Sequence, residues 1–158
     1  MKKMIVIRGP LGVGKTTVSK LLAQNLQAEY VSVDTILNDN NLANDETISL
    51  ESFLKVNKIV LELANKSEKN FVVDGNFYYQ EQIDDLQNKF KNDILIFTLI
   101  TDVETCIERD FKREKTYGED SVRYVHMITS RIKSGYEVDT SRLKVQETVE
   151  NIMMLLKN

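Results

Sequence analysis

The stretch from Gly9 to Thr16 constrains this chain more than any other. It reads Gly-Pro-Leu-Gly-Val-Gly-Lys-Thr and matches the pattern G-x-x-x-x-G-K-[ST] of a phosphate-binding loop, the Walker A motif. The preceding run from Met4 to Ile7 is entirely apolar, as expected for a buried strand of a parallel sheet. After the loop, apolar residues recur at helical spacing from Val18 to Leu26. The sequence therefore predicts a strand, a glycine-rich loop and a helix, the context that a phosphate-binding loop requires.

Each residue type in this loop has a chemical role in binding a polyphosphate. Glycines permit close approaches that a Cβ would block, so main-chain N–H groups and a helix N-terminus can face a polyphosphate. Lys15 adds a full positive charge near the outer phosphates, and the Thr16 hydroxyl is placed to bind Mg²⁺. We therefore expect ATP and Mg²⁺ as cofactors, with Thr16 as a metal ligand. The expected nucleotide-binding residues of this stretch are Gly9, Pro10, Leu11, Gly12, Val13, Gly14, Lys15, Thr16 and Thr17.

Length and composition bound the remaining possibilities. The 158 residues suffice for one core, and we expect residues 1–158 to form a single domain. A net charge of −3 gives no electrostatic footprint for nucleic acid, so a nucleic-acid partner is disfavoured. No apolar run approaches the ~20 residues of a membrane span. Without a signal segment, and with Cys106 as the single cysteine, a cytoplasmic protein without a membrane partner is expected, with Cys106 simply packed. The single histidine excludes a metal site built from several His and Cys ligands.

Apolar runs alternate with amphipathic segments along the whole chain, which indicates a parallel sheet with crossover helices. We expect one helix from about Leu50 to Lys66, one capped by Asp102 with Phe111 facing inward, and one capped by Asp120. The polar segment 38–46 is expected to be a mobile loop. The five expected strands are 4–7, 30–33, 71–73, 94–100 and 136–139.

With these features the chain resembles the small P-loop kinases, among them the nucleotide monophosphate, shikimate, gluconate and chloramphenicol kinases. The resemblance runs from Ile5 to Leu156 and is most specific at the phosphate-binding loop. It implies a three-layer α/β P-loop NTPase fold with a five-stranded parallel sheet of order 2-3-1-4-5. It also implies a substrate-binding region at about 35–65 and an arginine-bearing lid at about 109–120.

Two aspartates are expected at the carboxyl edge of the sheet, where open α/β folds bind ligands. Asp34 follows the second strand and can there hold an acceptor hydroxyl and take its proton, the role that the resemblance also implies. The alternative is a turn residue or a helix cap. Asp74 follows Phe71-Val72-Val73 in a Walker B pattern, which places a carboxylate near Mg²⁺, although Asp-Gly is also a common turn.

The residues after Asp74 bear on the acceptor. The stretch Asp74-Gly75-Asn76-Phe77 resembles Asp-Gly-Phe-Pro-Arg of adenylate kinases, but the Pro-Arg is absent. In that family the arginine grips the monophosphate acceptor, so its absence disfavours a nucleotide monophosphate kinase. Phe77, Tyr78 and Tyr79 form an aromatic cluster that can line an acceptor pocket or pack the following helix.

Arginines are the remaining candidates. Arg109 and Arg113 are four residues apart and share one helix face. The resemblance implies that such a pair closes over the triphosphate, and planar guanidinium groups suit phosphate oxygens. The alternative is a solvated basic face. Arg142, after the last strand, can cover the adenine by a cation–π contact or remain on the surface.

Together these residues predict an ATP-dependent kinase that transfers the γ-phosphoryl group to a hydroxyl of a small molecule. Lys15, Asp34, Arg109 and Arg113 are the candidate catalytic residues, and Thr16 and Asp74 the candidate metal ligands. One alternative is a nucleoside or nucleotide monophosphate kinase. Another is a nucleotide-binding regulatory ATPase without an acceptor. The sequence specifies neither the acceptor nor the oligomeric state.

Overall fold

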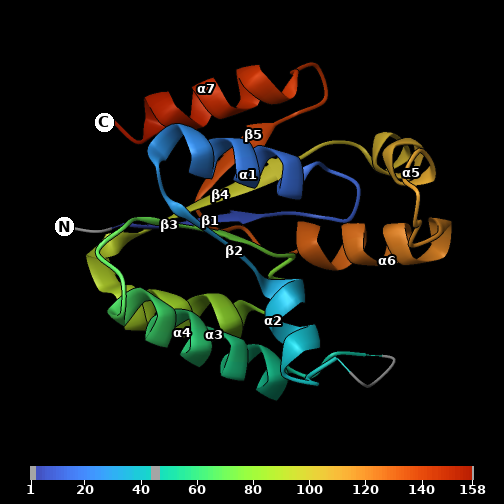
Figure 1. Ribbon diagram of the computed structural model, residues 1–158. Helices are drawn as coiled ribbons and strands as arrows, with labels where there is room; N and C mark the ends of the chain where they lie inside the picture. Colours follow the sequence, from blue (N-terminus) through green and yellow to red (C-terminus); the bar gives the residue numbers. More distant parts are fainter. Residues whose placement is uncertain (1–2, 44–46, 158) are drawn as a thin grey trace.

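The computed structural model describes residues 3–43 and 47–157. Its centre is a sheet of five parallel strands in the order β2-β3-β1-β4-β5 (Figure 1). The strands are β1 (Met4–Arg8), β2 (Glu29–Ser32), β3 (Phe71–Asp74), β4 (Ile94–Ile100) and β5 (Tyr136–Asp139). The order and the parallel direction confirm the fold that the resemblance implied.

Helices cover both faces of the sheet, which gives three layers (Figure 1). One face carries α1 (Lys15–Leu26) and α7 (Val145–Leu155), and the other carries α3 (Leu50–Asn65) and α4 (Gln80–Phe90). The short helix α2 (Val33–Asp39) follows β2, and the 3₁₀ turn η1 (Lys91–Asp93) precedes β4. Beyond the carboxyl ends of the strands lie α5 (Val103–Phe111) and α6 (Glu119–Ser130), next to the loop between β1 and α1.

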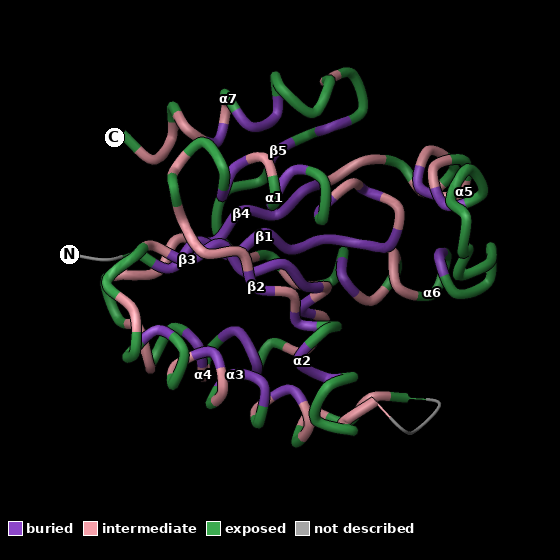
Figure 2. Tube along the Cα trace, in the orientation of Figure 1, coloured by how far each residue is buried: buried purple, intermediate pink, exposed green. Residues whose placement is uncertain are grey.

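Burial explains why the apolar sequence pattern is strong in some strands and weak in others. β1 and β3 are buried along their whole length because helices cover both of their faces (Figure 2). β5 is an edge strand with only Val138 buried, which explains its weak apolar pattern. Cys106 is fully buried in the core, as expected. Within the described residues, no helix has both the length and the apolar character needed to cross a membrane.

The segment after β2 differs from expectation. The strand ends at Ser32 rather than Val33, and α2 begins at once, because the Ser32 hydroxyl caps it by accepting the N–H of Thr35 at 3.3 Å. Asp34 therefore lies in the first turn of a helix. Of the expected loop 38–46, residues 38–39 belong to α2, and residues 44–46 lie outside the described residues.

The region from α5 to α6 brings two further corrections. Phe111, expected to face inward, is 83% exposed, whereas the neighbouring Asp110 is buried. The Asp110 carboxylate accepts the N–H groups of Tyr117 and Gly118, each at 3.1 Å, so it closes the loop between the two helices. Gly118, not Asp120, is consequently the N-cap residue of α6, which begins at Glu119. Asp110 is buried in place of Phe111, because its carboxylate accepts hydrogen bonds from two main-chain N–H groups.

Candidate active site

The loop between β1 and α1 leaves main-chain N–H groups free for a ligand. Gly14 precedes α1 with φ 102°, a conformation that favours glycine, and no side chain caps this helix. Gly12 packs closely on α5, because an added Cβ would lie 2.3 Å from the carbonyl oxygen of Cys106. Residues 11–18 line a cavity of about 690 Å³, which we call the first cavity. Its position at the start of α1 suits a polyphosphate.

The candidate residues of the loop divide into two groups. Leu11 to Thr17 line the first cavity, whereas Gly9 and Pro10 do not. Pro10 instead supplies the carbonyl that accepts a hydrogen bond from Lys15 Nζ at 2.7 Å. An added Cβ at Gly9 would lie 2.6 Å from the carbonyl oxygen of Leu99, so this glycine is needed for packing against β4. Gly9 and Pro10 thus stabilise the conformation of the loop, while Leu11 to Thr17 face the cavity.

Asp74 stands at the floor of the first cavity, where β3 ends. Its register partners are Ile7 of β1 and Ser32 of β2, so three parallel strands end near it. The Thr16 hydroxyl donates to Asp74 Oδ2 at 2.8 Å, and the Tyr30 hydroxyl donates to the same oxygen at 2.9 Å. The structure therefore brings together the two expected metal ligands and adds Tyr30, which sequence reasoning missed.

A hydroxyl and a carboxylate are the oxygen ligands that Mg²⁺ prefers. Thr16 is exposed to the cavity and Asp74 is nearly buried, so an ion held between nucleotide and protein could reach both through the cavity. The residues present thus fit the expected metal.

Lys15 and Asp34 each shift the pKa of the other in the first cavity. Burial lowers the pKa of the Lys15 ammonium, while Asp74 and Asp34 raise it and Arg113 lowers it further. Burial within the cleft raises the pKa of the Asp34 carboxyl, and Asp74 adds to the rise, against the opposing effects of Lys15 and Arg113. Asp34 is thus a more basic carboxylate than an ordinary aspartate.

The two expected lid arginines occupy different positions. Arg109 Nη1 donates to the carbonyl of Val13 at 3.1 Å and Nη2 donates to the carbonyl of Thr140 at 3.2 Å, which ties α5 to the phosphate-binding loop and to the end of β5. Arg113 lies beyond the last residue of α5, and its guanidinium stands 5.0 Å from the ring centre of Tyr117. Both arginines line the first cavity, although they do not share a helix face.

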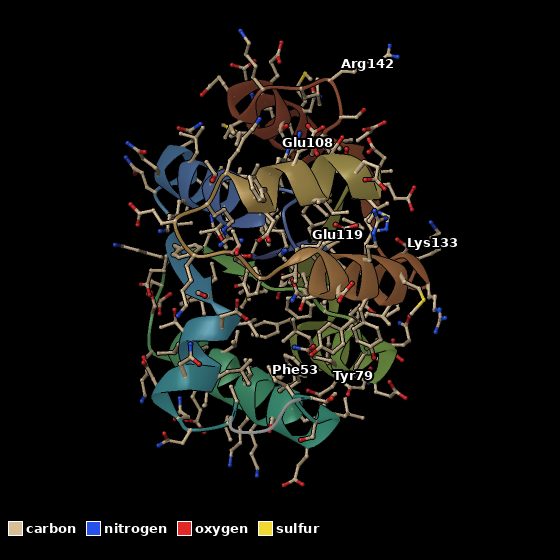
Figure 3. The ribbon with its side chains drawn as sticks, turned by 90° about the vertical axis from the view of Figure 1, so that its right-hand side faces the viewer. Phe53, Tyr79, Glu108, Glu119, Lys133 and Arg142 are labelled. Atoms are coloured by element: carbon tan, nitrogen blue, oxygen red, sulfur yellow. The ribbon has the colours of Figure 1, made fainter. Side chains whose placement is uncertain are left out.

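Arg142 is exposed, and Figure 3 places its side chain at the outer end of the β5–α7 connection. It does not line the first cavity, unlike its neighbours Leu143 and Lys144. The structure thus does not bring Arg142 to the nucleotide-binding residues. Instead, Arg109 and Thr140 lie at that end of the cavity.

A second cavity of about 710 Å³ adjoins the first. Tyr78 and Tyr79 of the expected aromatic cluster line it, while Phe77 is buried in the core. Phe53 of α3 holds the two tyrosine rings, at centroid distances of 5.3 Å and 5.8 Å, and Figure 3 shows Phe53 and Tyr79 side by side. Five residues line both cavities and so mark their junction: Leu11, Asp34, Asn76, Arg113 and Tyr117.

Comparison with known proteins agrees with this geometry. The model of AAA_33, an AAA domain family, matches residues 4–134. The chain belongs to the AAA_33 family. Two curated relatives extend the picture. The cytidylate kinase of Sulfurisphaera tokodaii is 42% identical over 71 residues, 45% of this chain and only 33% of that protein's length. The putative adenylate kinase of Thermococcus gammatolerans is 29% identical over 163 residues, 98% of this chain and 85% of that protein.

Among solved structures, the gluconokinase of Sinorhizobium meliloti 1021 has the same fold as this AAA_33 member. Its TM-score is 0.77 at 16% identity, and the match covers 99% of this chain and 94% of that one. The resemblance to the small P-loop kinases is confirmed by these comparisons, and with it the expectation of a phosphotransferase.

Proposed function

We propose that this protein transfers the γ-phosphoryl group of ATP, bound with Mg²⁺, to a hydroxyl group of a small molecule. One observation carries the proposal: Asp34 and Arg113 stand at the junction of two cavities of similar volume. The first cavity begins at the uncapped N-terminus of α1 and takes the triphosphate. The second takes the acceptor, so that its hydroxyl meets the γ-phosphoryl group at the junction.

Each residue has a role in this reaction. The loop amides and Lys15 hold the phosphates, and Arg113 neutralises charge on the transferring group. Arg109 and Thr140 support the nucleoside end of the first cavity. Thr16 and Asp74 would hold the Mg²⁺, which when bound neutralises charge on the phosphate oxygens. The regions proposed from the sequence also fit, because α2 and the 113–117 part of the lid both border the second cavity.

Asp34 is the proposed general base. As the acceptor oxygen forms its bond to the γ-phosphorus, the bond from that phosphorus to the β–γ bridging oxygen breaks and ADP leaves. The proton of the acceptor hydroxyl passes to the Asp34 carboxylate. The raised pKa of this carboxyl favours the transfer, since it makes the carboxylate a stronger base.

The test is Asp34→Asn, assayed as acceptor-dependent ADP release. We expect turnover to fall by roughly 10²–10⁴-fold, the range typical of a lost general base, while the affinity for ATP stays similar. Asp39→Asn is the matched control, because Asp39 lies at the other end of the same helix and lines neither cavity. Near-normal turnover of Asp34→Asn would reject Asp34 as the base and leave phosphoryl transfer without a general base.

A nucleotide monophosphate kinase is the second candidate, favoured by the names of the two curated relatives. Such an acceptor presents an already ionised phosphate oxygen, so it needs no base. On that reaction path Asp34→Asn would be mild, and nucleoside monophosphates would stimulate ADP release in both the parent protein and the variant.

A further inference from the structure

The second cavity is large for an acceptor. Its volume of about 710 Å³ compares with about 690 Å³ for the first cavity, which the proposed function assigns to ATP. A three-carbon polyol would leave most of this space filled with water. An acceptor that excludes water from the junction must therefore approach the size of a nucleoside.

The wall of the second cavity is aromatic. Tyr78, Tyr79, Tyr117 and Tyr124 all line it. The rings of Tyr78 and Tyr79 are held in place, because Tyr78 meets Phe53 edge to face at 84° and the Tyr79 hydroxyl donates to the carbonyl of Ile48 at 3.1 Å. Six residues add aliphatic surface to the wall: Leu11, Leu37, Ala43, Ile48, Val125 and Ile128. Uncharged polar residues complete it: Asn38, Thr47, Asn76, Thr116 and Ser121. Fixed aromatic and aliphatic faces favour a flat ring over a fully hydroxylated chain.

The same wall is poor in positive charge. Among the described lining residues, the charged side chains are Asp34, Arg113 and Lys115. Asp34 and Arg113 belong to the junction, and Arg113 also lies 4.0 Å from Asp110. Lys115 is exposed on the loop between α5 and α6. Arg123 does not line the cavity, since it pairs with Glu104 and Glu119 on the surface. A phosphate or carboxylate on the acceptor would thus meet no fixed guanidinium away from the junction.

Polar groups of the wall are available to a neutral ligand, among them the Tyr78 hydroxyl and the Asn76 amide. Within the part of the chain that the structure describes, the Tyr78 hydroxyl has no hydrogen-bond partner in the protein. Burial raises the pKa of Tyr78 to about 12, so the hydroxyl stays neutral and can donate. The Asn76 amide, at the junction, can donate and accept.

We infer that the acceptor is an uncharged alcohol that carries a flat ring and is about the size of a nucleoside. Its ring lies among the tyrosines, and its hydroxyl reaches Asp34. This inference rests on the proposed function, because it identifies the second cavity with the acceptor. It separates this protein from kinases whose acceptors bear a phosphate or a carboxylate.

The experiment is ADP release by the full chain with ATP, Mg²⁺ and three sets of acceptors. The uncharged ring-bearing set is adenosine, guanosine, cytidine, uridine and chloramphenicol. The anionic set is the four matching nucleoside 5′-monophosphates, shikimate and gluconate. Glucose and glycerol are uncharged and lack a flat ring. We expect the strongest stimulation, at least tenfold above the rest, from a member of the first set.

The other outcomes are equally decisive. Stronger stimulation by shikimate, gluconate, glucose or glycerol would overturn the inference and leave the proposed hydroxyl kinase standing. Stronger stimulation by a nucleoside monophosphate would overturn the inference and favour the nucleotide monophosphate kinase instead. If no compound stimulated ADP release, the proposed function would fall and the inference with it.

Variants test the position of the ring. With the stimulating acceptor, Tyr78→Leu should raise KM for the acceptor about tenfold and leave KM for ATP unchanged. Tyr124→Leu gives a second measurement if Tyr78→Leu fails to fold, because Tyr124 is 55% exposed. Tyr136→Leu is the matched control, since Tyr136 is half-exposed on β5 and lines neither cavity. An unchanged acceptor KM in both cavity variants would remove the tyrosines from the site.

Discussion

At the scale of single residues, the Asp34 carboxylate combines a proposed catalytic role with a penalty for stability. Its raised pKa means that the native state holds the proton more tightly than the unfolded chain does. The native state is therefore favoured while Asp34 is protonated, and this advantage is lost as pH rises through the raised pKa. At neutral pH the ionised carboxylate consequently destabilises the native protein.

A thermal measurement follows from this sign. In the protein without nucleotide, Asp34→Asn should raise the melting temperature at pH 7–8 relative to the parent, while it lowers turnover. The stabilisation should shrink as pH falls below the raised pKa, where the parent carboxyl becomes neutral too. Melting curves at several pH values check the expectation, with Asp39→Asn as control. A lower melting temperature for Asp34→Asn at pH 7–8 would contradict it.

Tyr30 acts on the same site through Asp74. Its hydroxyl and that of Thr16 share Asp74 Oδ2, so Tyr30 holds the carboxylate in the direction of the proposed metal. Tyr30→Phe should raise the Mg²⁺ concentration needed for half-maximal binding of a fluorescent ATP analogue by roughly tenfold. Binding in EDTA should stay unchanged, and Tyr136→Phe should resemble the parent. An unaltered Mg²⁺ dependence would make Tyr30 a packing residue only.

At the scale of elements, the loop between α5 and α6 depends on Asp110. This buried carboxylate binds two main-chain N–H groups of residues 117–118, and Arg113 and Tyr117 of that loop line both cavities. The loop that carries Arg113 is thus ordered from inside α5.

Asp110→Ala should therefore destabilise the protein by about 1–3 kcal/mol, because it removes a buried, charged acceptor of two main-chain N–H groups. Tryptic cleavage after Arg113 and Lys115 should accelerate several-fold, and KM for ATP should rise. Glu108→Ala is the matched control, since Glu108 is exposed on the same helix (Figure 3). Mass spectrometry of the fragments locates the cleavage. Equal cleavage rates in the two variants would show that Asp110 does not order the loop.

At the scale of the whole molecule, one buried arginine joins segments far apart in the chain. Arg8 is fully buried at the end of β1. Its Nη1 donates to Thr98 Oγ1 at 3.1 Å and to the Ile132 carbonyl at 3.2 Å. Its Nη2 donates to the carbonyls of Phe77 at 3.1 Å and Thr129 at 3.0 Å. One side chain thus connects the sheet to the end of α6 and to Phe77, the first residue of the aromatic cluster.

Arg8→Met should remove these four hydrogen bonds and leave the carbonyls of Phe77 and Ile132 without the guanidinium, whereas the Thr129 carbonyl still accepts the N–H of Ile132. We expect a loss of about 3 kcal/mol, which corresponds to a fall in melting temperature of roughly 6–12 °C for a chain of this size. Lys58→Met, at an exposed position of α3, should change the melting temperature little. A fall of only a degree or two for Arg8→Met would mean that water replaces the guanidinium at these carbonyls.

Several features of the site could be predicted from the sequence because their information is local. The phosphate-binding loop is contiguous, and the alternation of apolar runs with amphipathic segments predicted five parallel strands. Asp74 was predictable because it directly follows a buried strand. The prediction for Phe111 was wrong because helical periodicity does not include contacts with the next loop. Periodicity predicted that Phe111 faces inward, but Asp110 is buried instead and binds the following loop.

The sequence by itself thus determined the fold class, the nucleotide-binding loop and the Asp74 carboxylate at the end of β3, since neighbouring residues encode each of them. Only the tertiary structure decided which distant residues meet: Tyr30 with Asp74, Arg109 with Thr140, and Arg8 with the end of α6. It also decided that two cavities join at Asp34. The physical reason is that these contacts depend on how the strands and helices pack against one another, and residue spacing along the chain does not specify that packing.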